Sequence, residues 1–386
     1  MTINRRQSLA ALFAVAATPV LAQTVQVPVN AGWADVDAAA QKLLQAKVTP
    51  GVQVSVRKQG RTVYSKAFGT ANLEDWTPLT PQSICKIGSV TKQFTSCLIL
   101  LLAQDGRLGL DDTLAKYFPD HPRASDVTLR QMLSHTSGLG NYTNGPPGPT
   151  RQMMRTDYDT VGLLALMKTG RTQVFEPGTA YAYSNTAYLL LGLIAEKVAG
   201  KSYAEQARER LFGPLGLTRT AVDDMAEVIP GRAGGYSNDP KAPGGFANAS
   251  FISMTVPGGA GFMRSTCDDL CAWHAALLGG RVLKPEMLTA MLTPGLTNDG
   301  ALPKGSGGRE IRYGFGQQLF DAEGRKTVAH GGGINGFMSD LRTYPDAGVT
   351  IAHIFNTDGG AIPIPSQLGL IGIFRKTLTT AALAAA

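Results

Sequence analysis

The chain has 386 residues, of which 44% are hydrophobic and 17% charged, a composition typical of a folded protein rather than a disordered one. Its longest apolar runs, Leu9–Ala17 and Cys97–Ala103, fall short of the ~18 residues that a membrane-spanning helix needs, which excludes a polytopic membrane protein. The net charge of +7 is spread along the chain without a basic block, so we expect no nucleic-acid partner.

The first 22 residues have the features of an export signal. Arg5 and Arg6 form a positive segment, Leu9–Ala17 an apolar one, and Val20-Leu21-Ala22 a cleavage site with small residues. The arginine pair also fits a twin-arginine signal, a more specific alternative. We therefore expect residues 1–22 to be removed, and the mature chain to be periplasmic or secreted with no integral membrane segment.

The predicted elements differ between the ends of the chain and its middle. Helical spacing covers Trp33–Lys47; alternating valines at 52, 54 and 56 then predict a strand with one buried face, and Thr62–Phe68 a second strand. Helical patterns in the middle of the chain cover Lys92–Gln104, Val161–Lys168, Thr186–Ala199 and Ser202–Leu211. Near the C-terminus, short strands are predicted over Ile311–Phe320, Lys326–His330, Gly336–Tyr344 and Val349–Asn356. A last helix is predicted over Pro363–Leu383.

These elements predict an α+β fold. Short turns between the late strands favour antiparallel neighbours. Residues 23–110 and 285–386, the two ends of the mature chain, would form one antiparallel sheet domain flanked by the N- and C-terminal helices, and residues 111–284 a mainly helical lobe. A cleft between two such lobes is a usual place for a functional site.

The cysteines do not demand a metal or a disulfide. Cys267, Cys271 and His274 share one face of a predicted helix, which makes a metal site conceivable, but no fourth ligand lies near them in the sequence. Buried free thiols, which behave as small apolar side chains, are the better interpretation, and it applies to Cys85 and Cys97 as well. We expect no metal and no cofactor.

Ser-x-x-Lys occurs three times, and one copy sits where it could carry nucleophilic catalysis. On a helix, residues i and i+3 share a face, so the lysine amine can take the hydroxyl proton of the serine. Ser89 opens the apolar helix that contains Lys92, so we predict this pair as nucleophile and base; an N-capping serine beside a solvated lysine is the alternative. The other copies lie in a predicted strand or ahead of any helix: Ser55/Lys58 and Ser83/Lys86.

Tyr-x-Asn also occurs three times. Such a pair could supply a phenolic proton carrier and an amide that holds a substrate carbonyl. Tyr183 and Asn185 lie directly before a predicted helix, in a turn that we expect to be rigid, and we select this copy. The other two precede segments rich in Gly and Pro: Tyr142/Asn144 and Tyr236/Asn238.

A third motif, His330-Gly331-Gly332-Gly333, ends one predicted strand just before another begins. Glycines there let the backbone approach a substrate closely. A backbone N–H of this stretch could join that of Ser89 to form an oxyanion hole.

In this order, Gly88-Ser89-Val90-Thr91-Lys92, Tyr183-Ser184-Asn185 and His330-Gly331-Gly332 resemble the three motifs of the penicillin-recognising serine hydrolases. The flanking segments Arg130–Leu139 and Pro177-Gly178 support this resemblance. The chain is similar above all to exported serine-type D-Ala-D-Ala carboxypeptidases with a class C β-lactamase-like fold, a group that also has esterase relatives.

The resemblance implies a role for each motif residue. Ser89 would be the acylated nucleophile, Lys92 its proton acceptor and Tyr183 the general acid/base that hands a proton to the leaving group. No Gly-x-Ser-x-Gly elbow and no His-Glu-x-x-His pattern offers a competing catalytic motif.

The same resemblance implies the substrate-binding residues. Asn185 would hold the substrate amide, and the N–H groups of Ser89 and Gly333, next to Gly332, would form the oxyanion hole. His330 stands where many relatives carry a lysine that meets a substrate carboxylate, and its weaker charge at neutral pH leaves carboxylate recognition in question.

The function implied is an exported serine hydrolase acting through an acyl-serine, with D-Ala-D-Ala-type peptides as first substrate class. Its partners would be small peptides or esters, with peptidoglycan stem peptides as candidates, and β-lactams as covalent ligands. A carboxylesterase and then a β-lactamase are the alternatives. A non-catalytic penicillin-binding sensor is disfavoured, because the Ser, Lys, Tyr and Asn of the motifs are all present.

Overall fold

The structure is a computed structural model. It describes residues 31–143, 150–167, 173–305, 307–360 and 365–385. The predicted export signal, Asn144 and the predicted start of the last helix at Pro363 lie outside these residues.

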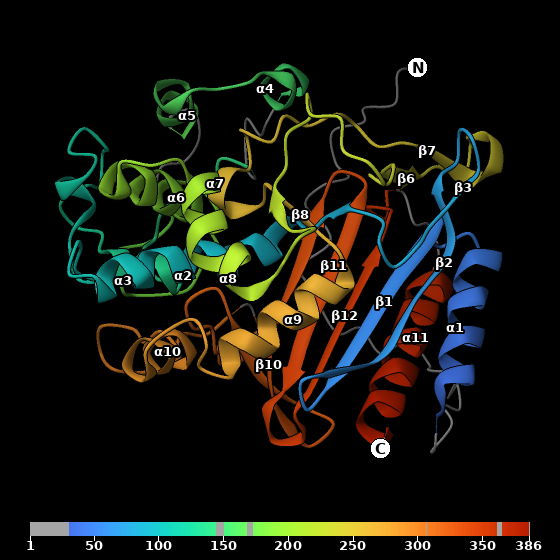
Figure 1. The fold of residues 1–386 in the computed structure, drawn as a ribbon. Helices are drawn as coiled ribbons and strands as arrows, with labels where there is room; N and C mark the ends of the chain where they lie inside the picture. Colours follow the sequence, from blue (N-terminus) through green and yellow to red (C-terminus); the bar gives the residue numbers. More distant parts are fainter. Residues whose placement is uncertain (1–30, 144–149, 168–172, 306, 361–364, 386) are drawn as a thin grey trace.

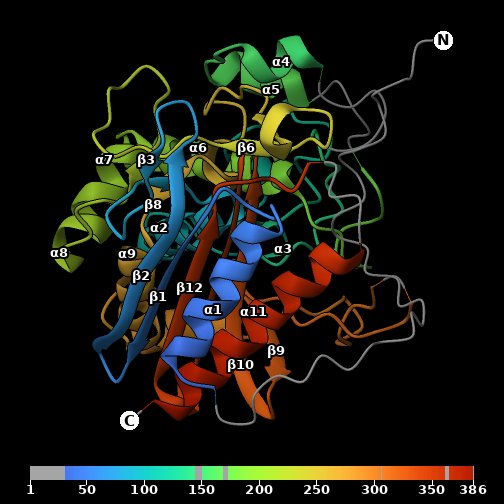
Figure 2. The ribbon, with the colours of Figure 1, turned by 90° about the vertical axis from the view of Figure 1, so that its right-hand side faces the viewer.

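A seven-stranded antiparallel sheet joins the two ends of the chain (Figures 1 and 2). Its central pair is β1 with β12, in which Val52 lies opposite Phe355 and Lys58 opposite Val349. This arrangement confirms the predicted α+β fold with an antiparallel sheet. In spatial order the strands are β3 (Thr77–Pro78), β2 (Arg61–Asn72), β1 (Gly51–Lys58), β12 (Val349–Phe355), β11 (Phe337–Tyr344), β10 (Arg325–Ile334) and β9 (Gln318–Ala322).

Helices cover both faces of the sheet. The helices α1 (Trp33–Gln45) and α11 (Pro365–Ala384) lie side by side on one face, as Figure 2 shows. The opposite face is covered by α9 (Cys267–Leu278), which packs against β1, β12 and β11 (Figure 1). The boundary expected at residue 284 places α9 in the helical lobe, yet the helix packs on the sheet; the division into two domains stays a prediction.

The expectation of a half-buried first strand was wrong. The valines of β1 pack toward α1 and α11, but Gln53 and Ser55 on the other face are fully buried beneath α9. Gln53 is satisfied there, because its side chain accepts the backbone N–H of Cys267 at 2.6 Å and donates to the carbonyl of Ser83 at 3.0 Å. Gln53 therefore faces a covering helix with hydrogen-bonding partners and not water.

The rest of the chain supplies a helical layer and two small sheets beside the large sheet (Figure 1). No helix in the described segments is long and apolar enough to cross a bilayer. The helices are α2 (Thr91–Gln104), α3 (Leu129–Leu133), α4 (Arg151–Arg155), α5 (Thr160–Met167), α6 (Asn185–Ala199), α7 (Tyr203–Ala207), α8 (Gly213–Leu215) and α10 (Pro285–Leu292), and the small sheets are β4 (Cys85–Lys86), β8 (Met263–Ser265) and β5 (Ala221–Val222), and β6 (Tyr236–Asn238) with β7 (Phe246–Asn248).

Two predicted elements are shorter than expected. The helix expected over Ser202–Leu211 is α7 followed by a π-helical turn over Arg208–Phe212. Of the strand expected over Ile311–Phe320, only the end enters β9. The preceding residues turn away because Gly316 has φ +70°, and a side chain there would press on the Lys92 carbonyl at 2.7 Å. This loop therefore packs directly against α2.

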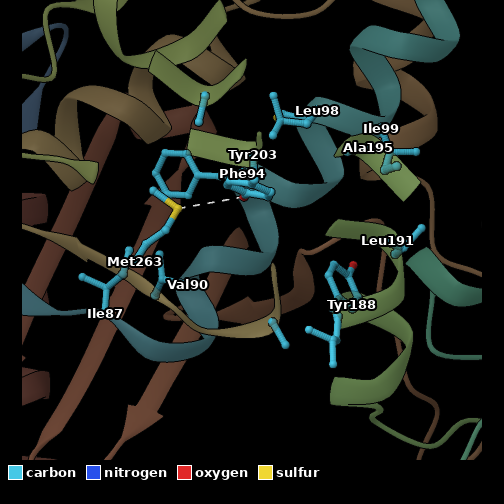
Figure 3. Packing of buried hydrophobic residues seen from close by; sticks show 14 of the residues in the cluster. Ile87, Val90, Phe94, Leu98, Ile99, Tyr188, Leu191, Ala195, Tyr203 and Met263 are labelled. Carbon is cyan, nitrogen blue, oxygen red and sulfur yellow. Dashed lines mark hydrogen bonds between the residues drawn. The ribbon is translucent and has the colours of Figure 1, made fainter. Parts of the chain in front are cut away.

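The helix α2 is buried along almost its whole length, which fixes the position of its first turn. Figure 3 shows Val90, Phe94 and Leu98 packed among side chains of α6 and the neighbouring segments. Phe94 also stacks on Trp273 of α9, with ring centroids 4.1 Å apart. Burial of each such side chain is worth about 1.5–3 kcal/mol, so this helix is a rigid support for the residues at its N-terminus.

The sheet meets the N-terminal end of α2 at Gly332. Ser339 of β11 donates a hydrogen bond to the carbonyl oxygen of Ile87 at 2.8 Å, just ahead of Ser89. A Cβ on Gly332 would overlap both that carbonyl oxygen and the Ser339 hydroxyl, whereas a Cβ on Gly333 would meet no atom within 4 Å. Gly332 is therefore required by packing between the sheet and the α2 segment.

We expect Gly332→Ala to lower the free energy of unfolding by about 1–3 kcal/mol or more, because overpacking here forces a backbone carbonyl to move. Gly333→Ala is the matched control and should be nearly neutral in stability. Urea unfolding of both variants measures the difference. Equal stability of the two variants would show that β10 does not press on the Ile87 backbone.

Candidate active site

The candidate nucleophile lies in a tight turn that leads into α2. Ser89 is the middle residue of a 3₁₀ turn over Gly88–Val90, and its hydroxyl accepts a hydrogen bond from the Lys92 amine at 3.2 Å. Gly88 has φ +49°, and a side chain there would come within 2.9 Å of the Gly333 backbone. This close approach places the backbones of the serine turn and of β10 side by side, as an oxyanion hole made from both would require.

The Lys92 amine is buried and surrounded by neutral acceptors. Besides Ser89 it donates to Asn185 Oδ1 at 2.7 Å and to the carbonyl oxygen of Ala260 at 2.8 Å. Its side chain is fully buried, and this burial holds the pKa of Lys92 well below the usual value. The amine is thus able to stay neutral and accept a proton from the serine hydroxyl at its side.

The Tyr183 ring lies over the same amine. Its centroid is 4.6 Å from Lys92 Nζ. Burial raises the pKa of Tyr183 well above the usual value, and a hydrogen bond with Ser89 opposes that effect. The phenol therefore stays protonated at neutral pH, and the serine hydroxyl lies between a neutral amine and a proton-bearing phenol.

Asn185, the first residue of α6, is fixed from two sides. Its carbonyl oxygen accepts from Lys92, and its Nδ2 donates to the hydroxyl of Thr143 at 2.8 Å. Thr143 in turn donates to Asn141 Oδ1 at 2.8 Å. Sequence reasoning missed Thr143 and Asn141, which precede Asn185 in the chain by about forty residues and reach it only through the fold.

The remaining copies of both motifs serve structural contacts. Tyr142 is buried and donates to the Val256 carbonyl, and Tyr236 in β6 donates to a carboxylate oxygen of Glu74. Ser55 is buried in β1, and the Ser83 hydroxyl accepts the N–H of Thr80. None of these contacts involves Ser89. The copies that the structure does bring together are those selected from the sequence: Ser89, Lys92, Tyr183 and Asn185.

The surroundings of His330 bear on its predicted contact with a substrate carboxylate. Its ring is buried, its Nε2 accepts from the Tyr313 hydroxyl at 2.9 Å, and its Nδ1 donates to the Gly331 carbonyl at 2.6 Å. Burial, with the nearby Lys92 amine, lowers the pKa of His330 to about 3. Both ring nitrogens are thus engaged within the protein and the ring is neutral, which does not fit the expected contact with a substrate carboxylate.

A cluster of aromatic rings packs against the Tyr183 ring. The Tyr313 ring lies 6.4 Å from that of Tyr183, and the His135 ring lies 4.4 Å from Tyr183 and 4.7 Å from Tyr313. Tyr313 was missed because its segment read as a strand. Its one sequence signal is the Tyr313-Gly314-Phe315-Gly316 turn.

The cysteines of α9 are engaged in packing. The Cys267 and Cys271 thiols donate to the backbone carbonyls of Gln53 and Ser55, and His274 Nδ1 lies 2.8 Å from the Thr343 hydroxyl. All four cysteines are buried and free. Within the described residues, no group of three or more His, Cys, Asp or Glu side chains is placed to hold a metal ion.

Comparison with known proteins agrees with this geometry. The family model described as "Beta-lactamase" matches residues 36–364. The chain is 30% identical to penicillin-binding protein 4* of Bacillus subtilis, over 78% of this chain and 66% of that protein, and 28% identical to the D-aminopeptidase of Brucella anthropi, over 83% and 58%. It thus spans about three-fifths to two-thirds of these relatives' length.

A solved structure gives the same result in three dimensions. The D-amino acid amidase of Ochrobactrum anthropi SV3, in complex with D-phenylalanine, superposes with a TM-score of 0.75 at 26% identity, over 90% of this chain and 99% of that one. The family match covers most of the chain, and this structurally similar protein is an amidase. The chain belongs to the β-lactamase family of serine hydrolases.

Proposed function

We propose that the protein is an exported hydrolase that cleaves the amide bond beside a D-amino acid residue through an acyl-Ser89 intermediate, with D-Ala-D-Ala-type peptides as first substrate class. The observation that carries this proposal is the buried Lys92 amine, 3.2 Å from the Ser89 hydroxyl and bonded to neutral acceptors. No metal or cofactor takes part in the proposed reaction.

In the acylation step, Ser89 Oγ attacks the substrate carbonyl carbon while its proton passes to Lys92. The N–H groups of Ser89 and Gly333 stabilise the resulting oxyanion, and Asn185 holds the substrate amide. The C–N bond then breaks, and the leaving amine takes a proton by way of Tyr183. A water molecule then attacks the acyl carbon, and its proton passes through the Lys92–Tyr183 pair to Ser89 Oγ. The C–Oγ ester bond breaks, the carboxylic acid product leaves, and the Ser89 hydroxyl is regenerated.

A second candidate is the hydrolysis of amides or peptides that carry a free D-amino acid at the N-terminal side. Two observations favour it: the neutral, fully bonded His330 supplies no charge for a carboxylate, and similar proteins are D-aminopeptidases and a D-amino acid amidase. A D-Ala-D-Ala peptide, a D-phenylalanine amide, a nitrophenyl ester and a chromogenic cephalosporin, assayed side by side, separate the candidates. Ester turnover without cleavage of either D-substrate would replace this proposal with a carboxylesterase.

Ser89→Ala should abolish covalent labelling by a fluorescent penicillin or a fluorophosphonate, because it removes the attacking oxygen. Labelling is measured by gel fluorescence and the adduct located by peptide mapping. Ser83→Ala, the matched control in the neighbouring Ser-x-x-Lys copy, should label normally. An adduct on Ser83 or Ser55 would disprove the assignment of the nucleophile.

Tyr183→Phe should lower kcat by at least ~10²-fold, within the range that general acid–base catalysis supplies. Ser89→Ala, Lys92→Ala and the double variant should be similarly inactive, because residues of one proton-transfer unit are not additive. Tyr142→Phe and Tyr236→Phe are matched controls, which lose a buried hydroxyl contact and some stability but keep kcat. A large kcat loss in Tyr142→Phe with none in Tyr183→Phe would contradict the site.

The pH dependence tests whether His330 contacts a substrate carboxylate. A ring whose pKa is about 3 stays neutral between about pH 5.5 and 8, so the rate ratio of an anionic peptide to a neutral ester should not rise as pH falls. Taking this ratio on one enzyme cancels the protonation of Lys92. A ratio that rises toward acid in the wild type and becomes flat in His330→Gln would show that His330 does read a substrate carboxylate.

A further inference from the structure

We infer that His135 is a positioning residue that holds the Tyr183–Asn185 turn in its catalytic geometry from the backbone side. This inference rests on the proposed function, since Tyr183 and Asn185 are the groups that it would position. Within the described part of the chain, His135 makes no hydrogen bond or ring contact with Ser89, so its effect would act through the turn.

His135 binds the turn on both sides of Tyr183. Its backbone carbonyl accepts the N–H of Ala182 at 3.0 Å, and its ring Nδ1 accepts the N–H of Ser184 at 3.1 Å. The imidazole also packs on the Tyr183 ring, with centroids 4.4 Å apart. One residue thus fixes the backbone before and after Tyr183, and the ring itself.

The hydrogen bonds determine the tautomer of His135. Because Nδ1 accepts an N–H, the ring proton resides on Nε2. The ring is fully buried, and within the described residues Nε2 has no hydrogen-bond partner. Burial, with the nearby Lys92 and His330, lowers the pKa of His135 well below the usual value, so Nδ1 stays an acceptor. An unpartnered buried donor destabilises the folded state, and an apolar residue here would avoid that cost.

The backbone of His135 carries a second cost. Its φ is +61°, in the left-handed region that non-glycine residues rarely occupy. Such a conformation is strained and persists where surrounding contacts enforce it, often next to active sites. The strained backbone directs the carbonyl toward Ala182 and the ring beneath Tyr183. His135 thus combines an unpartnered ring donor with a strained backbone, next to the proposed proton carrier. A positioning role explains why a histidine with both unfavourable features stands here.

The packing around the ring leaves the turn little freedom. The His135 ring contacts Tyr188 at 5.0 Å and Tyr313 at 4.7 Å between centroids. Tyr188 is itself fixed, because its hydroxyl donates to the Leu133 carbonyl at 2.7 Å, two residues before His135. Loss of the imidazole would therefore release the turn rather than let a neighbour replace it.

The test compares His135→Asn with His135→Gly. Both residues tolerate positive φ, but only asparagine places an acceptor oxygen near the position of Nδ1. Turnover of the best substrate in the panel is measured per active site, counted by penicillin labelling, together with KM and the melting temperature. We expect His135→Gly to lose kcat and kcat/KM together by up to ~10²-fold, the cost of a small misplacement, and His135→Asn to recover most of that loss.

The outcomes are distinguishable. A merely structural His135 would lower the melting temperature and the number of active sites in both variants but leave turnover per site equal, which would overturn the inference. If His135→Gly does not fold, His135→Gln replaces it: its acceptor lies near the Nε2 position, so it should fail where His135→Asn succeeds. Full activity in Ser89→Ala or Tyr183→Phe would instead defeat the proposed function itself.

Discussion

The site depends on keeping the amine of Lys92 out of water without giving it a counter-charge. A buried ammonium is costly, and a carboxylate beside it would favour the charged form and leave it unable to accept a proton. Here the amine meets one hydroxyl, one amide oxygen and one backbone carbonyl, from Ser89, Asn185 and Ala260. In the neutral form, the two N–H groups of the amine donate to Asn185 and Ala260, and its lone pair is left facing the Ser89 hydroxyl 3.2 Å away.

Close packing between α6 and a neighbouring turn brings one of these acceptors, the Ala260 carbonyl, to the amine. The Ala260 carbonyl belongs to a 3₁₀ turn over Gly258–Ala260 that lies directly on α6. A Cβ on Gly259 would come within 2.8 Å of the Tyr188 carbonyl, and one on Gly192 within 3.2 Å of the Gly259 backbone. Absence of side chains at this crossing lets the turn reach the amine. The same principle operates at Gly88 and Gly332, where the sheet meets the serine turn from the other side.

Local signals were enough to predict the antiparallel sheet, which followed from short turns near the C-terminus. The apolar run after Ser89 selected one Ser-x-x-Lys copy from three, and its role as nucleophile stays a prediction. The sequence predictions failed where a segment is buried by an element that lies far away in the chain. The polar face of β1 reads as solvent-facing, because α9, which buries it, lies some two hundred residues away. The loop around Tyr313 reads as a strand for the same reason: its partner is α2, not another strand.

The residue at position 330 affects the charge balance around Lys92. A lysine at this position would add a second cation near Lys92 and lower its pKa by repulsion. The neutral imidazole adds no such charge, and burial alone depresses the Lys92 pKa. Proton affinity at the base is then set by how well Asn185, Ala260 and the Tyr183 ring exclude water. A substrate bound over Ser89 would keep water away from this side of the amine as well, and would favour its neutral form until the serine proton arrives.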